Sequence, residues 1–230
     1  MALILRIDVD RPYGKKGPIR HIASRVSSDY YLPVIDRLGY LDELKIILRN
    51  LTERQKQAYV FYRKCTLPSA AVLELMRQGG HRAGLHLENS RTFETFQSEL
   101  HYFQKRVDLK IEAFSKHGSG KYRYGWNHYA PYEPDKYLQW GKQLGLRVFF
   151  GNHENPQLEP VRDGYLHYFP SAFWLEPHWR NTKLYDLAWL LSQARTRDVV
   201  LLFHPDNVIS DPRLMKDLLT ALEHLDVKLP

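Results

Sequence analysis

Two aspartates one residue apart, Asp8 and Asp10, end the apolar run of residues 3–12 (LILRIDVDRP). An apolar run of this length is typical of a buried strand, and residues i and i+2 of a strand share a face. The two carboxylates should therefore point the same way where the strand leaves the core. Such a pair is stable only beside a cation, a shared proton or a strong donor. This favours a metal or catalytic site over a pair neutralised by water or Arg11.

Later apolar segments also end in side chains that bind metal or move protons. These are His86 with Glu88, His117, Asn152 with Glu154, and His204. Asp10, His86 and His117 combine a carboxylate with two imidazoles, which is a ligand set for Zn²⁺ or another divalent ion. Glu88 would share a strand face with His86 and is a reserve ligand. A hydrogen-bonded core or loop histidine is the structural alternative at each position.

His204 follows the most apolar segment, residues 199–203 (VVLLF). A histidine at the end of a buried strand can protonate a leaving group. The alternative is that it caps its own loop, which Pro205 makes rigid.

Segments typical of strands and of helices alternate along the chain, and this order positions the residues above. The first expected strand lies in the apolar run of residues 3–12, and the others are residues 58–62, 82–86, 111–115, 146–150, 165–169, 172–175 and 199–203. The expected helices are 30–51 (as one or two helices), 68–78, 91–107, 135–144, 184–195 and 212–224. Continuous apolar strands predict a parallel sheet covered on both faces, hence an α/β fold, either a (β/α) barrel or an open doubly wound sheet. Both bind ligands at the carboxyl ends of the strands, so the candidate residues should meet at one rim.

Composition sets the class of protein. The chain has 230 residues, as expected for a single domain over 1–230, and a net charge of +7 that favours anionic partners. Residues 11–25 are rich in Gly, Pro and basic side chains and are expected to form a loop, either solvated or anion-binding. The basic residues form no concentrated stripe, which disfavours nucleic acid. A lone Cys65, no signal peptide and no apolar span predict a cytoplasmic protein without stable membrane insertion.

Two short motifs resemble known signatures. Residues 118–121 (GSGK) lack the spacing of a phosphate-binding loop. Residues 151–154 (GNHE) resemble a block of the metallophosphoesterases, but that family also needs Asp-x-His after its first strand and a later Gly-His-x-His. Neither is present here, and a metallophosphoesterase-like hydrolase is kept as the alternative.

The chain resembles the polysaccharide deacetylase superfamily (NodB homology, carbohydrate esterase family 4) over nearly its whole length. The resemblance is carried by IDVDRP, by residues 80–86 (GHRAGLH) and by LLFHP. It implies a distorted (β/α)7-type barrel with a parallel sheet. It also implies that Asp8 is the general base, that Asp10 and His86 bind metal, and that His204 is the general acid.

The second histidine ligand is where the chain departs from the family. The usual position, four residues beyond His86, is Ser90. Divergent members take this ligand from the next strand end, and His117 in FSKHGSG matches that variant. The family's Arg-x-Pro-x-Tyr-like loop is matched only loosely by residues 129–132 (YAPY).

The resemblance implies a metal-dependent deacetylase, with Zn²⁺ as the expected ion and a metal-activated water attacking an acetamido sugar. The segments FSKHGSG, SAFWLEPHW and LLFHP are also similar to WbmS-like proteins of bacterial O-antigen loci. This similarity implies an anionic sugar of lipopolysaccharide or its nucleotide-linked precursor. The expected substrate-binding residues are Arg11, Glu88, Tyr132, Asn152, Glu154 and Trp174. A catalytically inactive sugar-binding homologue is a further alternative, because Ser90 replaces a histidine.

Overall fold

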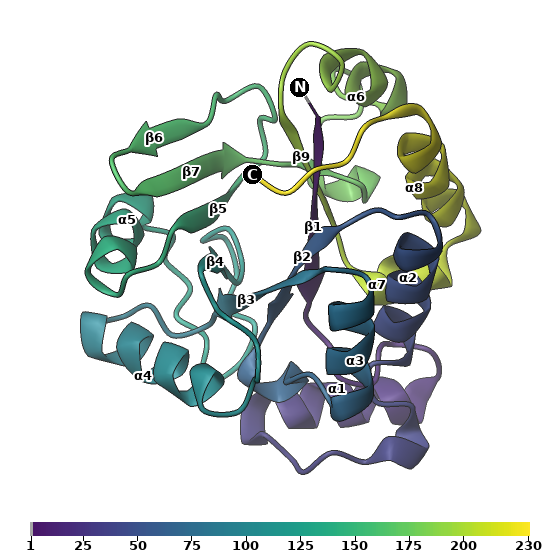
Figure 1. The fold of residues 1–230 in the computed structure, drawn as a ribbon. Helices are drawn as coiled ribbons and strands as arrows, with labels where there is room; N and C mark the ends of the chain where they lie inside the picture. The colour runs from purple at the N-terminus through teal and green to yellow at the C-terminus, as the bar shows by residue number, and fades with distance from the viewer. Residues whose placement is uncertain (1) are drawn as a thin grey trace.

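A curled sheet of nine strands forms the centre of the computed structural model, which describes residues 2–230 (Figure 1). The strands are β1 (Leu3–Val9), β2 (Ala58–Tyr62), β3 (Arg82–Leu87), β4 (Ala113–Lys116), β5 (Val148–His153), β6 (Val161–Asp163), β7 (Leu166–Ser171), β8 (Phe173–Trp174) and β9 (Val199–Phe203). Their order is β6-β7-β5-β4-β3-β2-β1-β9-β8, and every neighbouring pair is parallel except β6 with β7. The predicted α/β fold with a distorted, mostly parallel barrel is therefore confirmed, as a half-barrel with edges at β6 and β8.

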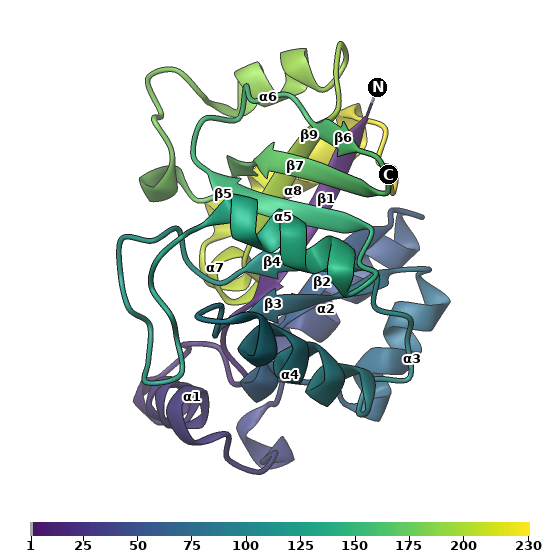
Figure 2. The same cartoon turned by 90° about the vertical axis from the view of Figure 1, so that its left-hand side faces the viewer.

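Helices pack around this sheet, most of them on its outer face and α1 beside the carboxyl ends of the strands (Figures 1 and 2). They are α1 (Pro18–Tyr30), α2 (Asp42–Glu53), α3 (Ala70–Gln78), α4 (Phe93–Gln104), α5 (Pro134–Gln143), α6 (Leu187–Gln193), α7 (Pro205–Ser210) and α8 (Pro212–His224), with 3₁₀ turns at Asp36–Leu38, Lys64–Thr66 and Pro177–Trp179. The main apolar core lies between sheet and helices, and a smaller cluster around Phe61 and Phe150 fills the inside of the curl. Because both faces are packed, all seven residues of β1 are buried.

Helix α1 corrects the expectation of a loop over residues 11–25. Pro18 begins the helix at a position where its missing N–H costs nothing. The face that packs on the protein carries Ser24 and Ser27, and Ser24 Oγ accepts from Tyr13 N (3.1 Å) and donates to Gly14 O (2.9 Å). The expectation was wrong because it followed the Gly, Pro and basic residues of the segment, whereas a proline in the first turn and serines on the inward face are compatible with a helix.

Gly84 allows β2, β3 and β4 to pack closely beneath the rim. A Cβ atom at this position would lie 2.3 Å from Cε1 of Phe61 and 3.1 Å from the carbonyl oxygen of Ala113. Contacts this short force a shift of side chain or backbone. The glycine of the GHRAGLH segment therefore has a packing role, which keeps β3 in register and places His86 beside Ser115 of β4.

Since the strands are parallel, their carboxyl ends meet along one rim. Asp8 pairs in register with Phe61 of β2, and Ile7 with Phe203 of β9. His204, directly after β9, thus lies near the end of β1. No helix among residues 2–230 is long and apolar enough to cross a bilayer.

Candidate active site

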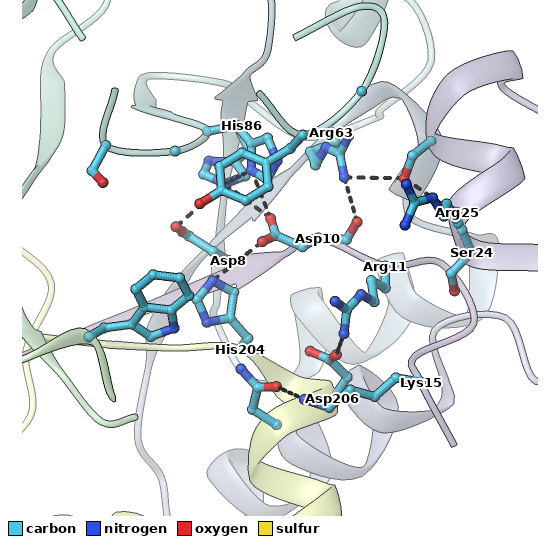
Figure 3. A pocket seen from close by; sticks show the side chains of 18 of the residues that line it. Asp8, Asp10, Arg11, Lys15, Ser24, Arg25, Arg63, His86, His204 and Asp206 are labelled. Carbon is cyan, nitrogen blue, oxygen red and sulfur yellow. Dashed lines mark hydrogen bonds and ion pairs between the residues drawn. The ribbon is translucent and has the colours of Figure 1, made fainter. Parts of the chain in front are cut away.

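A cavity of about 440 Å³ opens at the carboxyl ends of the strands (Figure 3). Its size is within the range of small-molecule sites. Among the residues that line it are Asp8, Asp10, His86, His117 and His204. The rim expected from the order of strands and helices is therefore formed, and these five side chains lie together.

The side chains of Asp10, His86 and His117 converge on one point. Asp10 Oδ1 lies 3.2 Å from His86 Nε2 and 3.2 Å from His117 Nδ1, and the two ring nitrogens are 3.1 Å apart. Two donor atoms bound to one Zn²⁺-like ion are about 2.8–3.6 Å apart, given bond lengths near 2.0–2.2 Å and angles between octahedral and tetrahedral. The three donor atoms therefore form a triangle of the size that a single divalent ion requires.

The protonation states of these groups also suit a metal. Burial alone would raise the pKa of Asp10, but the interactions of its carboxylate with the rings of His117 and His86, and the positive charge of His204, hold that pKa well below its usual range. Burial lowers the pKa of His117 well below the usual value, so its ring is neutral. Carboxylates and neutral imidazoles are the metal-binding forms. Asp10 Oδ1 is buried and has no hydrogen-bond partner within residues 2–230, as expected of an atom that binds an ion.

Ser115 orients the ring of His86. Its Oγ lies 2.7 Å from His86 Nδ1, which leaves Nε2 directed at Asp10. A hydrogen bond on the second ring nitrogen is the usual way in which proteins fix a histidine ligand.

Asp8 is held by a buried arginine on its own strand. Arg6 Nε and Nη2 donate to the two carboxylate oxygens of Asp8 at 2.9 and 2.6 Å, and the Arg6 side chain is fully buried. Arg6 also donates to Gly151 O (2.7 Å) and Asn152 Oδ1 (2.8 Å) at the end of β5. Such a bidentate pair fixes the carboxylate in one orientation, with Oδ2 3.5 Å from His86 Nε2.

His204 is protonated and anchored by Glu176. Its Nδ1 donates to Glu176 Oε1 at 2.9 Å, and its Nε2 lies 3.4 Å from Asp10 Oδ2. Burial lowers the pKa of His204, but the charge and hydrogen bond of Glu176, with Asp10 and Asp8 nearby, raise it to about 10. The same Glu176 oxygen accepts from the amide of Asn207 (2.9 Å). The ring therefore presents an acidic N–H to the cavity.

We expect Glu176→Gln to lower kcat by about 10–100-fold, the usual effect of losing the partner that orients a site histidine. Glutamine keeps the length of the side chain and one acceptor oxygen but removes the charge that keeps His204 protonated. The measurement is the steady-state rate of acetate release from the acetamido sugars that are assayed under the proposed function. Glu43→Gln, which alters another buried carboxylate that pairs with an arginine, is the matched control. Equal losses in both variants would show a general effect of losing a buried acid.

Four of the predicted substrate-binding residues line the cavity: Arg11, Asn152, Glu154 and Trp174. Arg11 does not neutralise the aspartate pair, because its Nη1 is bound to Asp206 Oδ2 at 2.9 Å. Glu154 pairs with Lys121 at 2.7 Å on the surface. The Asn152 amide is engaged by protein on both sides, since its Nδ2 donates to Gly118 O at 2.8 Å and its Oδ1 accepts from Arg6.

Glu88 and Tyr132 lie outside the cavity lining. Glu88 is buried in an ion pair with Arg63, and it is not part of the metal-ligand triangle. The Tyr132 hydroxyl accepts a hydrogen bond from the backbone N–H of Asn152 at 3.0 Å. These contacts place both side chains behind the cavity lining, and their binding of substrate stays a prediction.

Arg6, Ser115 and Glu176 are site residues that the sequence reasoning missed. The sequence contains enough information to find Arg6. It is a charged residue inside a buried strand, so it needs a partner, and it lies two residues before Asp8, so both side chains face the same side of the sheet. Glu176 in the aromatic segment SAFWLEPHW carried a similar signal. Ser115 carried none, since a serine in a strand is ordinary.

Comparison with protein families and with curated proteins yields no match to this sequence. Among solved structures, a similar one is described as a family 4 acetyl xylan esterase from Clostridium thermocellum in complex with a cobalt ion. It is 12% identical, with a TM-score of 0.39, over 96% of this chain and 83% of that chain. A likeness of this size assigns neither site nor activity to the chain.

Proposed function

We propose that this chain is a metal-dependent deacetylase that removes an acetyl group from an acetamido sugar. The observation that supports it most is the triangle of donor atoms from Asp10, His86 and His117. The carboxylate of Asp8 and the protonated ring of His204 lie beside this triangle in the same cavity. Hydrolysis of an amide needs a base for the attacking water and an acid for the departing nitrogen. The cavity contains one group of each kind.

Asp10, His86 and His117 would hold the ion, and Zn²⁺ is the proposed ion for this donor set. When bound, it would supply Lewis acidity toward the acyl oxygen and make water more acidic. Asp8, kept in place by Arg6, accepts the proton of the attacking water. His204 donates its Nε2 proton to the leaving nitrogen, and Glu176 stabilises the charged ring until then.

The cavity walls are consistent with an anionic sugar. Trp174 and Trp179 line one side with ring centroids 5.9 Å apart and offer flat apolar faces for a sugar ring. Arg25 also lines the cavity and adds positive charge, and Arg11 lines it while paired with Asp206. We therefore propose a uronate or a phosphate-linked acetamido sugar, such as a precursor of lipopolysaccharide O-antigen, as the substrate class.

A metallophosphoesterase is favoured less. Two-metal sites hold their ions about 3.5–4 Å apart and need ligands for both. Within residues 2–230 one group of three potential ligands is found. A single ion with a separate acid and base fits acyl hydrolysis better.

The test is elemental analysis of the purified chain together with an assay on UDP-N-acetylglucosamine and N-acetylglucosamine oligosaccharides. We expect about one divalent ion per chain, release of acetate, and loss of acetate release after chelation. Release of phosphate in place of acetate would favour the phosphoesterase. Sugar binding by the metal-loaded protein with no acetate released would favour an inactive sugar-binding homologue.

A further inference from the structure

Helix α1 presents an apolar stripe to solvent. Its exposed members are Ile19 (70%), Ile22 (60%), Val26 (37%) and Tyr30 (57%). Spacings of three and four residues place them on one side of the helix, while Ser24 and Ser27 face the protein. The helix is thus amphipathic with its apolar side outward. Soluble proteins rarely leave such a contiguous apolar patch uncovered unless it binds something.

The loop between β4 and α5 extends this patch. Trp126, 66% exposed, packs edge-on against Tyr30 with ring centroids 5.1 Å apart. Its backbone N–H donates to Asp29 Oδ1 (3.0 Å), and Asn127 Nδ2 donates to Asp29 O (2.9 Å). Figure 2 shows the loop reaching α1. We call Ile19, Ile22, Val26, Tyr30 and Trp126 the apolar surface.

Positive charge surrounds the apolar surface. The same two segments and the turns beside them carry the exposed basic residues Lys15, Lys16, Arg25, Arg37, Lys121 and Arg123, of which Lys121 is paired with Glu154. A bilayer with anionic lipids offers a counterpart to both features, because its headgroups attract cations and its acyl region accepts apolar side chains. Tyrosine and tryptophan rings favour the boundary between the two.

We propose that α1 and the β4–α5 loop dock this protein on the surface of a bilayer that contains anionic lipids, with the apolar surface at headgroup depth. Arg25 of α1 and Arg123 and Tyr124 of the loop also line the cavity. The cavity therefore opens beside the docked face, where a sugar carried on a lipid would be presented. This last step rests on the proposed deacetylase function, whereas docking itself needs neither metal nor turnover.

The test is flotation of the full chain with vesicles of phosphatidylcholine alone or mixed equally with phosphatidylglycerol. We expect binding to the mixed vesicles, weakened by salt, and weaker binding to phosphatidylcholine. Ile22→Asp should reduce binding by about 10–100-fold, because the favourable transfer of an apolar side chain from water into the bilayer is lost. Lys16→Glu should reduce binding to the mixed vesicles by about tenfold, since it exchanges an attractive charge for a repulsive one.

Matched controls separate docking from general effects. Val161→Asp changes an equally exposed residue (51%) on β6, far from α1 in Figures 1 and 2, and should bind like the wild type. So should Arg195→Glu, which changes an exposed arginine two residues beyond α6, an element that lies far from α1 in Figures 1 and 2. All variants alter exposed side chains, so unchanged melting temperatures are expected.

Three outcomes would overturn the proposal: no flotation with either vesicle, wild-type flotation of Ile22→Asp, or a dimer in sedimentation velocity that Ile22→Asp abolishes. The last would mean that the apolar surface pairs two copies of the chain. Asp8→Asn should bind vesicles like the wild type. Vesicle binding without acetate release would therefore count against the deacetylase alone, and acetate release without vesicle binding against docking alone.

Discussion

Replacing Asp8 by asparagine should lower kcat by about 10²–10⁴-fold, the usual contribution of a general base, and leave the metal content unchanged. Asparagine has nearly the same shape, and its oxygen can still accept from Arg6, but it cannot take a proton from water. Asp8 is not part of the triangle of Asp10, His86 and His117. Acetate release and elemental analysis on the same preparation measure the two effects.

Stability is the confounding effect in this variant. Removing one partner of a buried ion pair costs up to about 3–5 kcal/mol, and Arg6 is fully buried. Glu43→Gln, which breaks another ion pair between a buried carboxylate and an arginine outside the cavity, shows how much activity such a loss removes by itself. A folded, metal-loaded Asp8→Asn protein with wild-type turnover would place the base elsewhere.

We expect His117→Ala to reduce the metal content from about one ion per chain to near zero, and activity with it. Losing a partner that only supports a ligand costs about 10–100-fold in affinity, and losing a ligand costs more. His117 Nδ1 is one corner of the donor triangle, 3.2 Å from Asp10 Oδ1 and 3.1 Å from His86 Nε2. Metal titration followed by elemental analysis measures the loss.

His81→Ala is the matched control. His81 is also a buried imidazole, but its Nδ1 accepts from the backbone N–H of Ala58, away from the cavity. This variant should lose stability and keep its metal. Metal retained by His117→Ala would remove His117 from the ligand set, and metal then lost by Glu88→Gln would assign the position to the reserve ligand.

The meeting of the site residues could be predicted from the sequence because it follows from strand order alone. Apolar runs such as residues 199–203 clearly predict strands. Parallel strands bring Asp10, His86 and His204 to one rim whatever the detailed packing. The strands β2 and β9 have the expected bounds. The roles of the individual residues stay predictions until they are measured.

Partners across the sheet could not be predicted in the same way. Glu176 contacts His204 from 28 residues away. The sequence predicts a strand over residues 172–175 beside it, but not that this strand pairs with β9. The sequence predicts a loop where α1 begins because glycine, proline and basic residues dominate residues 11–18, although the apolar residues of the helix recur at helical spacing. That spacing does not say which side of the helix is buried. The sequence predicts that Tyr132 binds substrate, and only the structure shows that its hydroxyl accepts a hydrogen bond from the backbone N–H of Asn152.

The central position of β1 in the sheet determines the order in which parts of the site unfold locally. Local unfolding begins at edges and exposed segments, and strands bonded on both sides open last. Arg6 and Asp8 lie on β1, which is paired with β2 and β9, so their amides should exchange with solvent only when the whole chain unfolds. Glu176 lies just beyond the edge strand β8, which is paired only with β9, so we expect its backbone amide to exchange before those of β1. Local opening would then release His204 from Glu176 while Asp8 and Arg6 stay paired.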